Sequence, residues 1–254
     1  MSDAAPALPP ALSIDGAVAT ITLRRPAQAN RLEPSDLDTL LSQVEACNAD
    51  PRVLVLRIRS TGRYFCSGFE IGRIGAGDHV AFDRMVDAVE HARPITIAVV
   101  HGGVYGGATD LALACDFRIG TTAVDMFMPA ARLGLHYYRS GLERYVSRLG
   151  IDMAKRLFLT AERIDAQRML ACGFLTDLVE PAALDAAVDD LTQSLRSMAP
   201  IPLIAMKKNL NRIARGTLDA DELAADIAQA RASEDLKEGT AAFAERRAPR
   251  FAGR

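Results

Sequence analysis

Hydrophobic and polar positions along the first 180 residues predict strands interleaved with helices. Residues 17–23 alternate and are rich in β-branched side chains, whereas 53–58 and 95–100 are short apolar runs, as expected of strands inside a sheet. Between these runs, apolar residues in 34–50 and 80–92 follow a helical pattern, with spacings of three and four in the first. This alternation indicates an α/β fold.

Beyond residue 180 the pattern changes to helices alone. We therefore expect a core at residues 11–180 and an all-helical region at 181–254. The first ten residues, which include Pro6, Pro9 and Pro10, are interpreted as a loose tail. The helices expected in the second region cover about 184–198, 203–213, 221–231 and 235–246.

A glycine-rich turn follows the apolar strand 95–100 and leads into a helix of small residues. Residues 101–116 read HGGVYGGATDLALACD, so free backbone N–H groups stand at a helix start. Such a start stabilises negative charge on a ligand, and glycine lets a ligand oxygen approach the backbone closely. Asp110 lies just inside this helix. The segment predicts a site for an oxyanion beside a carboxylate.

Composition excludes several classes of partner. The chain has 254 residues, 49% of them hydrophobic, and a net charge of −2, so we expect neither nucleic acid nor a membrane as a partner. The N-terminal residues lack the features of a signal peptide. Four cysteines, too far apart for a zinc motif, predict a reducing, cytoplasmic location and no metal site. Basic residues from Lys237 to Arg254 either face solvent or meet a phosphate-bearing ligand.

Three blocks of the sequence resemble the enoyl-CoA hydratase/isomerase (crotonase) superfamily. They are residues 65–71 (FCSGFEI), 101–118 and 127–135 (FMPAARLGL), and the resemblance covers about residues 12 to 251. It implies a crotonase-like spiral of ββα turns with a C-terminal all-helical region that serves trimerisation and contacts with coenzyme A. It also implies an acyl-CoA thioester as the substrate, no separate cofactor, and a homotrimer or homohexamer.

By position, the resemblance assigns an oxyanion hole to the backbone N–H groups of Phe69 and Gly107. An enolate oxygen carries more charge than the carbonyl from which it forms, so fixed donors stabilise the transition state preferentially. Arginine and aromatic side chains suit the phosphates and adenine of coenzyme A. The positions that the resemblance assigns to coenzyme A are Arg24, Cys66, Ser67, Phe69, Phe243 and Arg247.

The sequence departs from the family at the catalytic carboxylates. Hydratases of the family use two glutamates, whose positions fall here on Asp110 and Ala130, and alanine can neither activate water nor donate a proton. Asp110 is similar to the aspartate of dienoyl-CoA isomerases, whose second aspartate falls on Tyr138. We expect an enzyme of the enoyl-CoA hydratase/isomerase type in which Asp110 is the sole remaining acid/base carboxylate. Double-bond isomerisation and one-carboxylate hydration are its simplest reactions.

Several alternatives stay open. Tyr138 or His136 could replace the lost proton donor, or both could cover the pocket mouth or a subunit interface. Glu143 is either an alternative acid or a solvated residue. The chain could also be a CoA-thioester-binding protein with lost or altered catalysis, as Ala130 suggests. A serine hydrolase and a dinucleotide-binding oxidoreductase are disfavoured, because the sequence lacks a Gly-x-Ser-x-Gly elbow and the full glycine fingerprint.

Overall fold

A mostly parallel sheet forms the centre of the computed structural model, which describes residues 7–70 and 79–254. The strand order is β1-β2-β3-β4-β6-β9, with β1 antiparallel to β2 and each later neighbour parallel. A smaller sheet has the order β5-β7-β8. The strands are β1 (Leu8–Asp15), β2 (Val18–Arg24), β3 (Val55–Ser60), β4 (Ile95–Val100), β5 (Val104–Tyr105), β6 (Phe117–Thr121), β7 (Asp125–Phe127), β8 (Ile164–Asp165) and β9 (Asp177–Val179).

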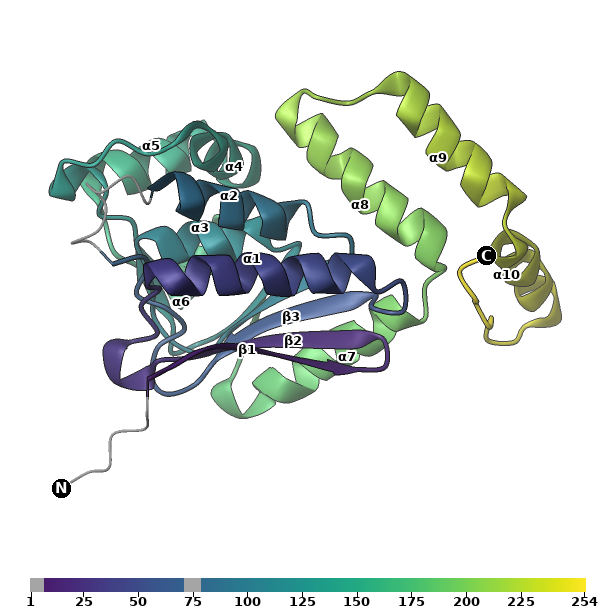
Figure 1. The fold of residues 1–254 in the computed structure, drawn as a ribbon, viewed down its shortest axis with the longest axis horizontal. Coiled ribbons are helices and arrows are strands. Elements are labelled where there is room, and N and C mark those ends of the chain that lie inside the picture. Colours follow the sequence, from purple (N-terminus) through teal and green to yellow (C-terminus); the bar gives the residue numbers. More distant parts are fainter. Residues whose placement is uncertain (1–6, 71–78) are drawn as a thin grey trace.

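Helices cover both faces of the large sheet, with α1 to α3 on one side and α7 on the other (Figure 1). Helices α8 to α10 lie beside this core (Figure 1). No helix in the described ranges is long and apolar enough to cross a lipid bilayer. The helices are α1 (Pro34–Ala49), α2 (His79–Glu90), α3 (Gly107–Ala114), α4 (Arg139–Leu149), α5 (Ile151–Thr160), α6 (Ala166–Ala171), α7 (Leu184–Arg196), α8 (Pro200–Arg215), α9 (Ala220–Ala232) and α10 (Glu234–Glu245).

Strand β4 is buried on both faces and is apolar except for Thr96, whose amide and hydroxyl both donate to Asp116 Oδ2. Ile97 and Val99 pack with Val188 of α7, whereas Ala98 and Val100 pack into the larger core beneath α1 to α3. Successive side chains of a strand point to opposite faces, so a strand between two helical layers is mainly apolar. The run at residues 95–100 therefore places β4 in the middle of the molecule.

Helix α7 belongs with the core by its packing. Leu184, Val188 and Leu195 are buried against β3, β4 and β6, although the expected division at residue 181 assigned them to the C-terminal region. The helices that lie beside the sheet layers begin at α8. Lys207 anchors α8 to the core, because its Nζ donates to Pro94 O at 2.6 Å and pairs with Asp116 Oδ2 at 2.7 Å.

The expectation of a loose tail up to residue 10 is wrong for residues 8–10, which belong to β1. Strand β1 is an edge strand, and a register irregularity separates Leu8 from Ala11. Proline lacks an N–H donor, but an edge strand with a bulge tolerates it. Arg24 holds this end of the strand, since its Nε donates to Pro9 O at 2.9 Å.

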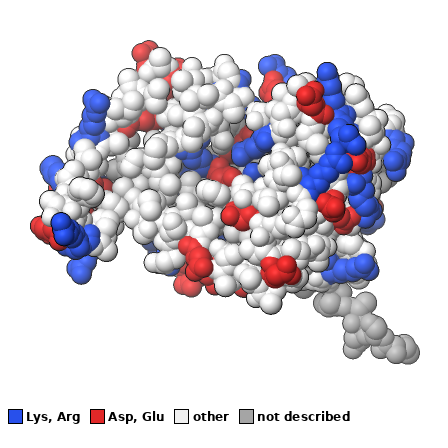
Figure 2. All heavy atoms as spheres, turned by 180° about the vertical axis from the view of Figure 1, so that it is seen from behind, with Lys and Arg blue, Asp and Glu red and all other residues white. Residues whose placement is uncertain are grey.

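The molecular surface carries charges of both signs. Figure 2 shows Lys and Arg on both sides of the molecule with Asp and Glu among them, and large uncharged areas between these groups. The small net charge of −2 reflects this mixture. No broad field of one sign covers this face (Figure 2).

Candidate active site

A cavity of about 480 Å³ opens beside the glycine-rich turn between β5 and α3. Its walls are mainly apolar and aromatic, and the segment around Ala130 forms one side. Within the described part of the lining, no side chain carries a carboxylate. The lining residues are Ser67, Phe69, Phe82, Tyr105, Gly106, Gly107, Phe127, Met128, Pro129, Ala130, Leu133, Leu135, His136, Tyr137 and Tyr138.

Two backbone segments meet at this cavity. Gly106 (φ 55°, ψ −131°) turns the chain from β5 into α3, and Gly68 has a φ of 96°, conformations that favour glycine. A Cβ atom on Gly68 would lie 3.0 Å from the Gly107 nitrogen, so the two segments approach closely. Tyr105 N donates to Cys66 O at 3.0 Å and fixes this approach.

The amides of Phe69 and Gly107 are unengaged at the cavity. Both residues line it, and neither amide donates a hydrogen bond to any residue in the described ranges. Gly107 is the first residue of α3, where backbone N–H groups have no partner within the helix. The two residues predicted to provide the donors therefore line one cavity, and neither amide has an acceptor among the described residues.

Gly107 has no room for a side chain. A Cβ atom there would lie 2.6 Å from Cζ of Phe82, and Phe82 packs against Phe69 with ring centroids 5.8 Å apart. Phe82 therefore connects the two segments that carry the free amides. A glycine at position 107 keeps Phe82 in this place.

Asp110 lies behind the cavity wall. Its side chain is fully buried on α3, and Arg144 Nη1 donates to its Oδ1 at 2.7 Å. The hydroxyl of Tyr138 donates to its Oδ2. Tyr138 lines the cavity and Asp110 does not. Helix α4 can approach because position 141 is glycine, where a Cβ would lie 2.9 Å from Asp110 Oδ2.

The phenol of Tyr138 keeps its proton in this environment. Burial of its hydroxyl and the nearby Asp110 charge raise the pKa of Tyr138 well above the ordinary value of a tyrosine, against the opposing effect of Arg144. The neutral phenol therefore persists at physiological pH. Tyr137 stacks on Tyr138 with ring centroids 4.5 Å apart, and burial likewise raises the pKa of Tyr137.

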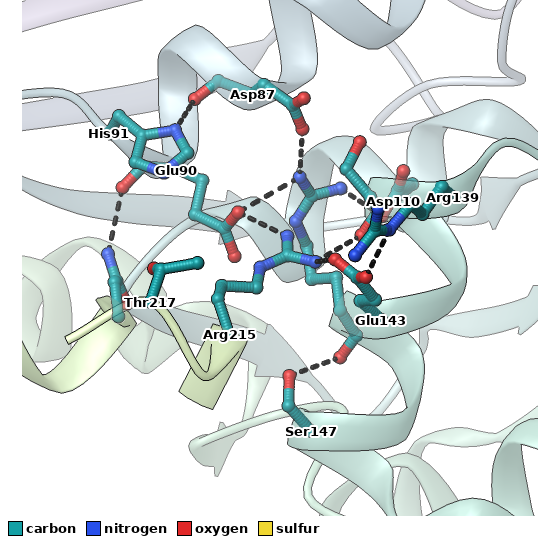
Figure 3. Close-up of polar contacts among 12 residues, drawn as sticks. Asp87, Glu90, His91, Asp110, Arg139, Glu143, Ser147, Arg215 and Thr217 are labelled. Atoms are coloured by element: carbon teal, nitrogen blue, oxygen red, sulfur yellow. Dashed lines mark hydrogen bonds and ion pairs between the residues drawn. The ribbon is translucent and has the colours of Figure 1, made fainter. Parts of the chain in front are cut away.

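Arg144 joins Asp110 to a buried network of charges. Its side chain has no solvent exposure, and its Nη2 lies 2.6 Å from Asp87 Oδ1 and 3.2 Å from Glu90 Oε2. Figure 3 shows Asp87 and Glu90 of α2 and Arg215 of α8 converging on this region. Arg144 could not be recognised as a site residue from the sequence, because one arginine on a helix of mixed charge carries no signal that distinguishes burial from exposure.

His136 and Glu143 differ in their relation to the cavity. His136 lines it, and its Nδ1 lies 2.8 Å from the carbonyl oxygen of Tyr137. A carbonyl only accepts, so Nδ1 carries the hydrogen and Nε2 of the neutral ring is an acceptor. Glu143 lies outside the described lining and pairs with Arg139 at 2.7 Å and Arg215 at 3.1 Å.

The residues predicted to contact coenzyme A divide into two groups. Ser67 and Phe69 line the cavity. Cys66 lies beneath the surface with its Sγ 3.0 Å from Asn30 O, and Arg24 is bound to Pro9 O. In the C-terminal helical region, Phe243 is 88% exposed on α10, and Arg247 pairs with Glu238 at 2.6 Å. None of these last four residues lines the cavity, and their contact with coenzyme A stays a prediction.

Comparison with known proteins identifies relatives that span the whole chain. Residues 13–254 match the sequence profile described as enoyl-CoA hydratase/isomerase. The chain is 29% identical to methylmalonyl-CoA decarboxylase from Escherichia coli over 93% of its length and 95% of the relative. It is 30% identical to crotonyl-CoA hydratase from Syntrophomonas wolfei, over 92% and 94% of the two chains.

Solved structures show the same architecture. An enoyl-CoA hydratase from Bacillus anthracis superposes with a TM-score of 0.88 at 25% identity, and the alignment covers 97% of this chain and 100% of that one. An enoyl-CoA hydratase/isomerase family member superposes with a TM-score of 0.89 at 28% identity, covering 96% of each chain. These superpositions confirm the expected α/β class with a C-terminal helical region.

Proposed function

Because this chain belongs to the enoyl-CoA hydratase/isomerase family, we propose that it is an enzyme that binds an acyl-CoA thioester in the cavity and stabilises the thioester enolate. The observation that carries this proposal is that Phe69 and Gly107 line one cavity and that neither amide donates a hydrogen bond within residues 7–70 and 79–254. Fixed donors aimed at a developing oxyanion need no rearrangement during the reaction. Each such donor lowers the barrier by about 3 kcal/mol.

Tyr138 supplies the proton to the carbon next to the thioester. It lines the cavity, holds its proton at neutral pH, and is oriented by Asp110. Asp110 contributes through Tyr138, because its own carboxylate lies behind the wall and is bound to Arg144. This assignment keeps both residues in the mechanism but gives the contact with substrate to Tyr138.

Decarboxylation of a malonyl-type thioester fits this set of groups best. The bond between the α-carbon and the carboxylate breaks, its electron pair forms the enolate, and carbon dioxide leaves. The hydroxyl of Tyr138 then turns from Asp110 to the enolate carbon and gives it the proton, and the resulting phenolate regains a proton from solvent. No general base is needed, in accordance with a described lining that holds no carboxylate. The Escherichia coli relative carries the name of such a reaction.

Hydration or double-bond isomerisation is the second candidate, and it needs a base at the cavity. His136 is the residue that favours it, since it lines the cavity with Nε2 as an acceptor. In this case crotonyl-CoA, a 3-enoyl-CoA or a 3,5-dienoyl-CoA would be consumed. Deuterium uptake at the carbon next to the thioester in heavy water, lost in His136→Ala, would identify the base.

One experiment separates these functions. The protein is offered methylmalonyl-CoA, crotonyl-CoA, a 3-enoyl-CoA and a 3,5-dienoyl-CoA side by side, and consumption is followed together with release of carbon dioxide. Consumption of the first with release of carbon dioxide supports decarboxylation. Consumption of one of the others supports the second candidate. Binding of a thioester without turnover of any would overturn both and support the alternative of a CoA-thioester-binding protein.

The role of Tyr138 has its own test. Tyr138→Phe removes only the hydroxyl, so turnover should fall by about 10²- to 10⁴-fold, as expected for the loss of a proton donor. Affinity for the unreactive thioester acetyl-CoA should change little. Tyr64→Phe is the matched control, because Tyr64 lies outside the cavity lining. Equal turnover in the two variants would remove Tyr138 from the mechanism.

We also propose that the chain assembles as a homotrimer or homohexamer through α8 to α10. Met206, Leu210, Ile213 and Phe243 are exposed on these helices, and contiguous exposed apolar surface marks interaction sites. Leu210→Asp should lower the mass measured by light scattering to that of a monomer, whereas Leu159→Asp on α5 should not. A monomeric wild-type protein at micromolar concentration would contradict this assembly.

A further inference from the structure

We propose that Arg215, the last residue of α8, is a positioning residue for the Asp110–Tyr138 pair, to which it is connected through Glu90 and Arg144. This inference rests on the proposed function, in which Tyr138 donates the proton. Arg215 touches neither Asp110 nor Tyr138. It acts by fixing the charges that hold Asp110 in place.

The first link is the shared guanidinium of Arg144. Its Nη1 donates to Asp110 Oδ1 at 2.7 Å, while its Nη2 donates to Asp87 at 2.6 Å and to Glu90 at 3.2 Å. One cation therefore faces three carboxylates, and the side chain of this cation, Arg144, has no solvent exposure. The position of this cation depends on how strongly each carboxylate attracts it.

The second link is Arg215. Its side chain is only 8% exposed, its Nη2 donates to Glu90, and its Nη1 donates to Ser140 O at 2.6 Å and to Glu143 at 3.1 Å. It thus binds α2 and the first turn of α4 at once (Figure 3). Glu90 is balanced between two cations, Arg144 on one side and Arg215 on the other.

The loss of Arg215 has a defined electrostatic consequence. Glu90 would keep Arg144 as its only cation, and the cluster would gain net negative charge. Arg144 would then hold Asp110 less firmly, and a less firmly held Asp110 no longer orients the hydroxyl of Tyr138. Because Arg215 helps to lower the pKa of Glu90, its loss raises that pKa toward the ordinary value of a glutamate. The charged or titratable groups that face Asp110 in this region are Asp87 and Glu90 from α2, Tyr137 and Tyr138 before α4, Arg144 and Tyr145 from α4, and Arg215 from α8 beyond Glu90.

The test compares Arg215→Met with Arg212→Met. Arg212 lies one turn earlier on α8 and pairs with Glu222 of α9. Arg212→Met therefore removes the same charge from the same helix but leaves the contacts among Arg144, Glu90 and Asp110 unchanged. In Arg215→Met we expect kcat to fall about 10-fold with KM little changed. The fall is smaller than the roughly 10²- to 10⁴-fold loss expected when the proton donor itself is removed, because Arg215 acts only on its orientation. The acid limb of the kcat profile should move to higher pH. Arg212→Met should keep the wild-type values.

A merely structural role for Arg215 predicts different results. In a Tyr138→Phe background, Arg215→Met should have little further effect on kcat, because the two residues act on one step. Additive losses, or an unmoved acid limb, would overturn the inference. Glu90→Gln removes a negative charge from the cluster and should move the acid limb to lower pH, so it provides the test even if Arg215→Met does not fold.

Failure of this inference can be told apart from failure of the proposed function. Undiminished turnover in Tyr138→Phe would contradict the function itself. A large loss in Tyr138→Phe together with wild-type behaviour in Arg215→Met would leave the function intact and contradict only the role of Arg215.

Discussion

Asp110 and Arg144 form an ion pair that has no contact with solvent. Nη1 of the arginine lies 2.7 Å from Oδ1 of the aspartate, and neither side chain has any exposed surface. A buried pair of this kind is costly to break, because the remaining charge stays without its partner. The pair also leaves one carboxylate oxygen free to accept the hydroxyl of Tyr138.

Replacing Asp110 by asparagine should therefore lower the stability of the protein as well as its turnover. We expect the free energy of unfolding to fall by about 3 kcal/mol, since Arg144 loses a charged partner in the interior. Urea titration measures this change. Asp185→Asn is the control, because Asp185 forms a solvent-exposed pair with Arg59 and such pairs contribute at most about 1 kcal/mol. A similar loss of the free energy of unfolding in both variants would contradict a larger contribution from the buried pair.

A side chain at position 107 should disturb both amides. In Gly107→Ala the new Cβ would lie 2.6 Å from Phe82, so Phe82 must move and displace Phe69. We expect a loss of about 1–3 kcal/mol in stability from overpacking and a fall in turnover of roughly 10²-fold from misplacement of the donors. Gly239→Ala is the control, because that helix interior position leaves its Cβ at 3.4 Å or more from its neighbours. Unchanged turnover in Gly107→Ala would contradict the placement of the oxyanion hole.

Thiol reagents should not inactivate the folded protein through Cys66. Burial raises the pKa of Cys66 and of Cys115 to about 12 and that of Cys47 to about 11, and the thiolate is the reactive form. At pH 8, iodoacetamide should label Cys172 first, since that residue is partly exposed. Mass spectrometry of the folded and urea-unfolded protein measures the order. Rapid labelling of Cys66 in the folded state would indicate an accessible nucleophile.

Stability should decrease in acid partly through Glu90. Burial of Glu90 raises its pKa, but Arg144 and Arg215 together outweigh burial and leave the pKa below the ordinary value of 4.5. A carboxylate with a lowered pKa stabilises the fold above its unfolded value and loses this effect as the pH falls through the folded value. Urea titrations at pH 7 and pH 4 should show a smaller loss for Glu90→Gln than for wild type. Glu245→Gln, at an exposed position, should lose as much stability between pH 7 and pH 4 as wild type. An equal loss in wild type, Glu90→Gln and Glu245→Gln would contradict the prediction.

The sequence alone indicated most of the strands and helices, and its resemblance to the family pointed to the amides of Phe69 and Gly107. Hydrophobic spacing repeats every two residues in a strand and every 3.6 in a helix, so 53–58, 95–100 and the helices after residue 183 could be recognised locally. Glycines 106 and 107 indicated the start of α3, because backbone conformation depends on neighbouring residues. Strand β1 was missed, since its prolines indicate a loop unless the strand is known to lie at a sheet edge.

The partners of Asp110 were decided only by the tertiary structure. Asp110 and Arg144 are separated by 34 residues, and Glu90 and Arg215 by 125, distances at which no local pattern relates one charge to another. In the sequence Glu90, Arg144 and Arg215 resemble solvated charges on helix faces. Packing of α2, α3, α4 and α8 brings them into a common interior, where burial strengthens the electrostatic interaction of each charge with its neighbours. The same packing places Tyr138 in the lining of the cavity and Asp110 behind it.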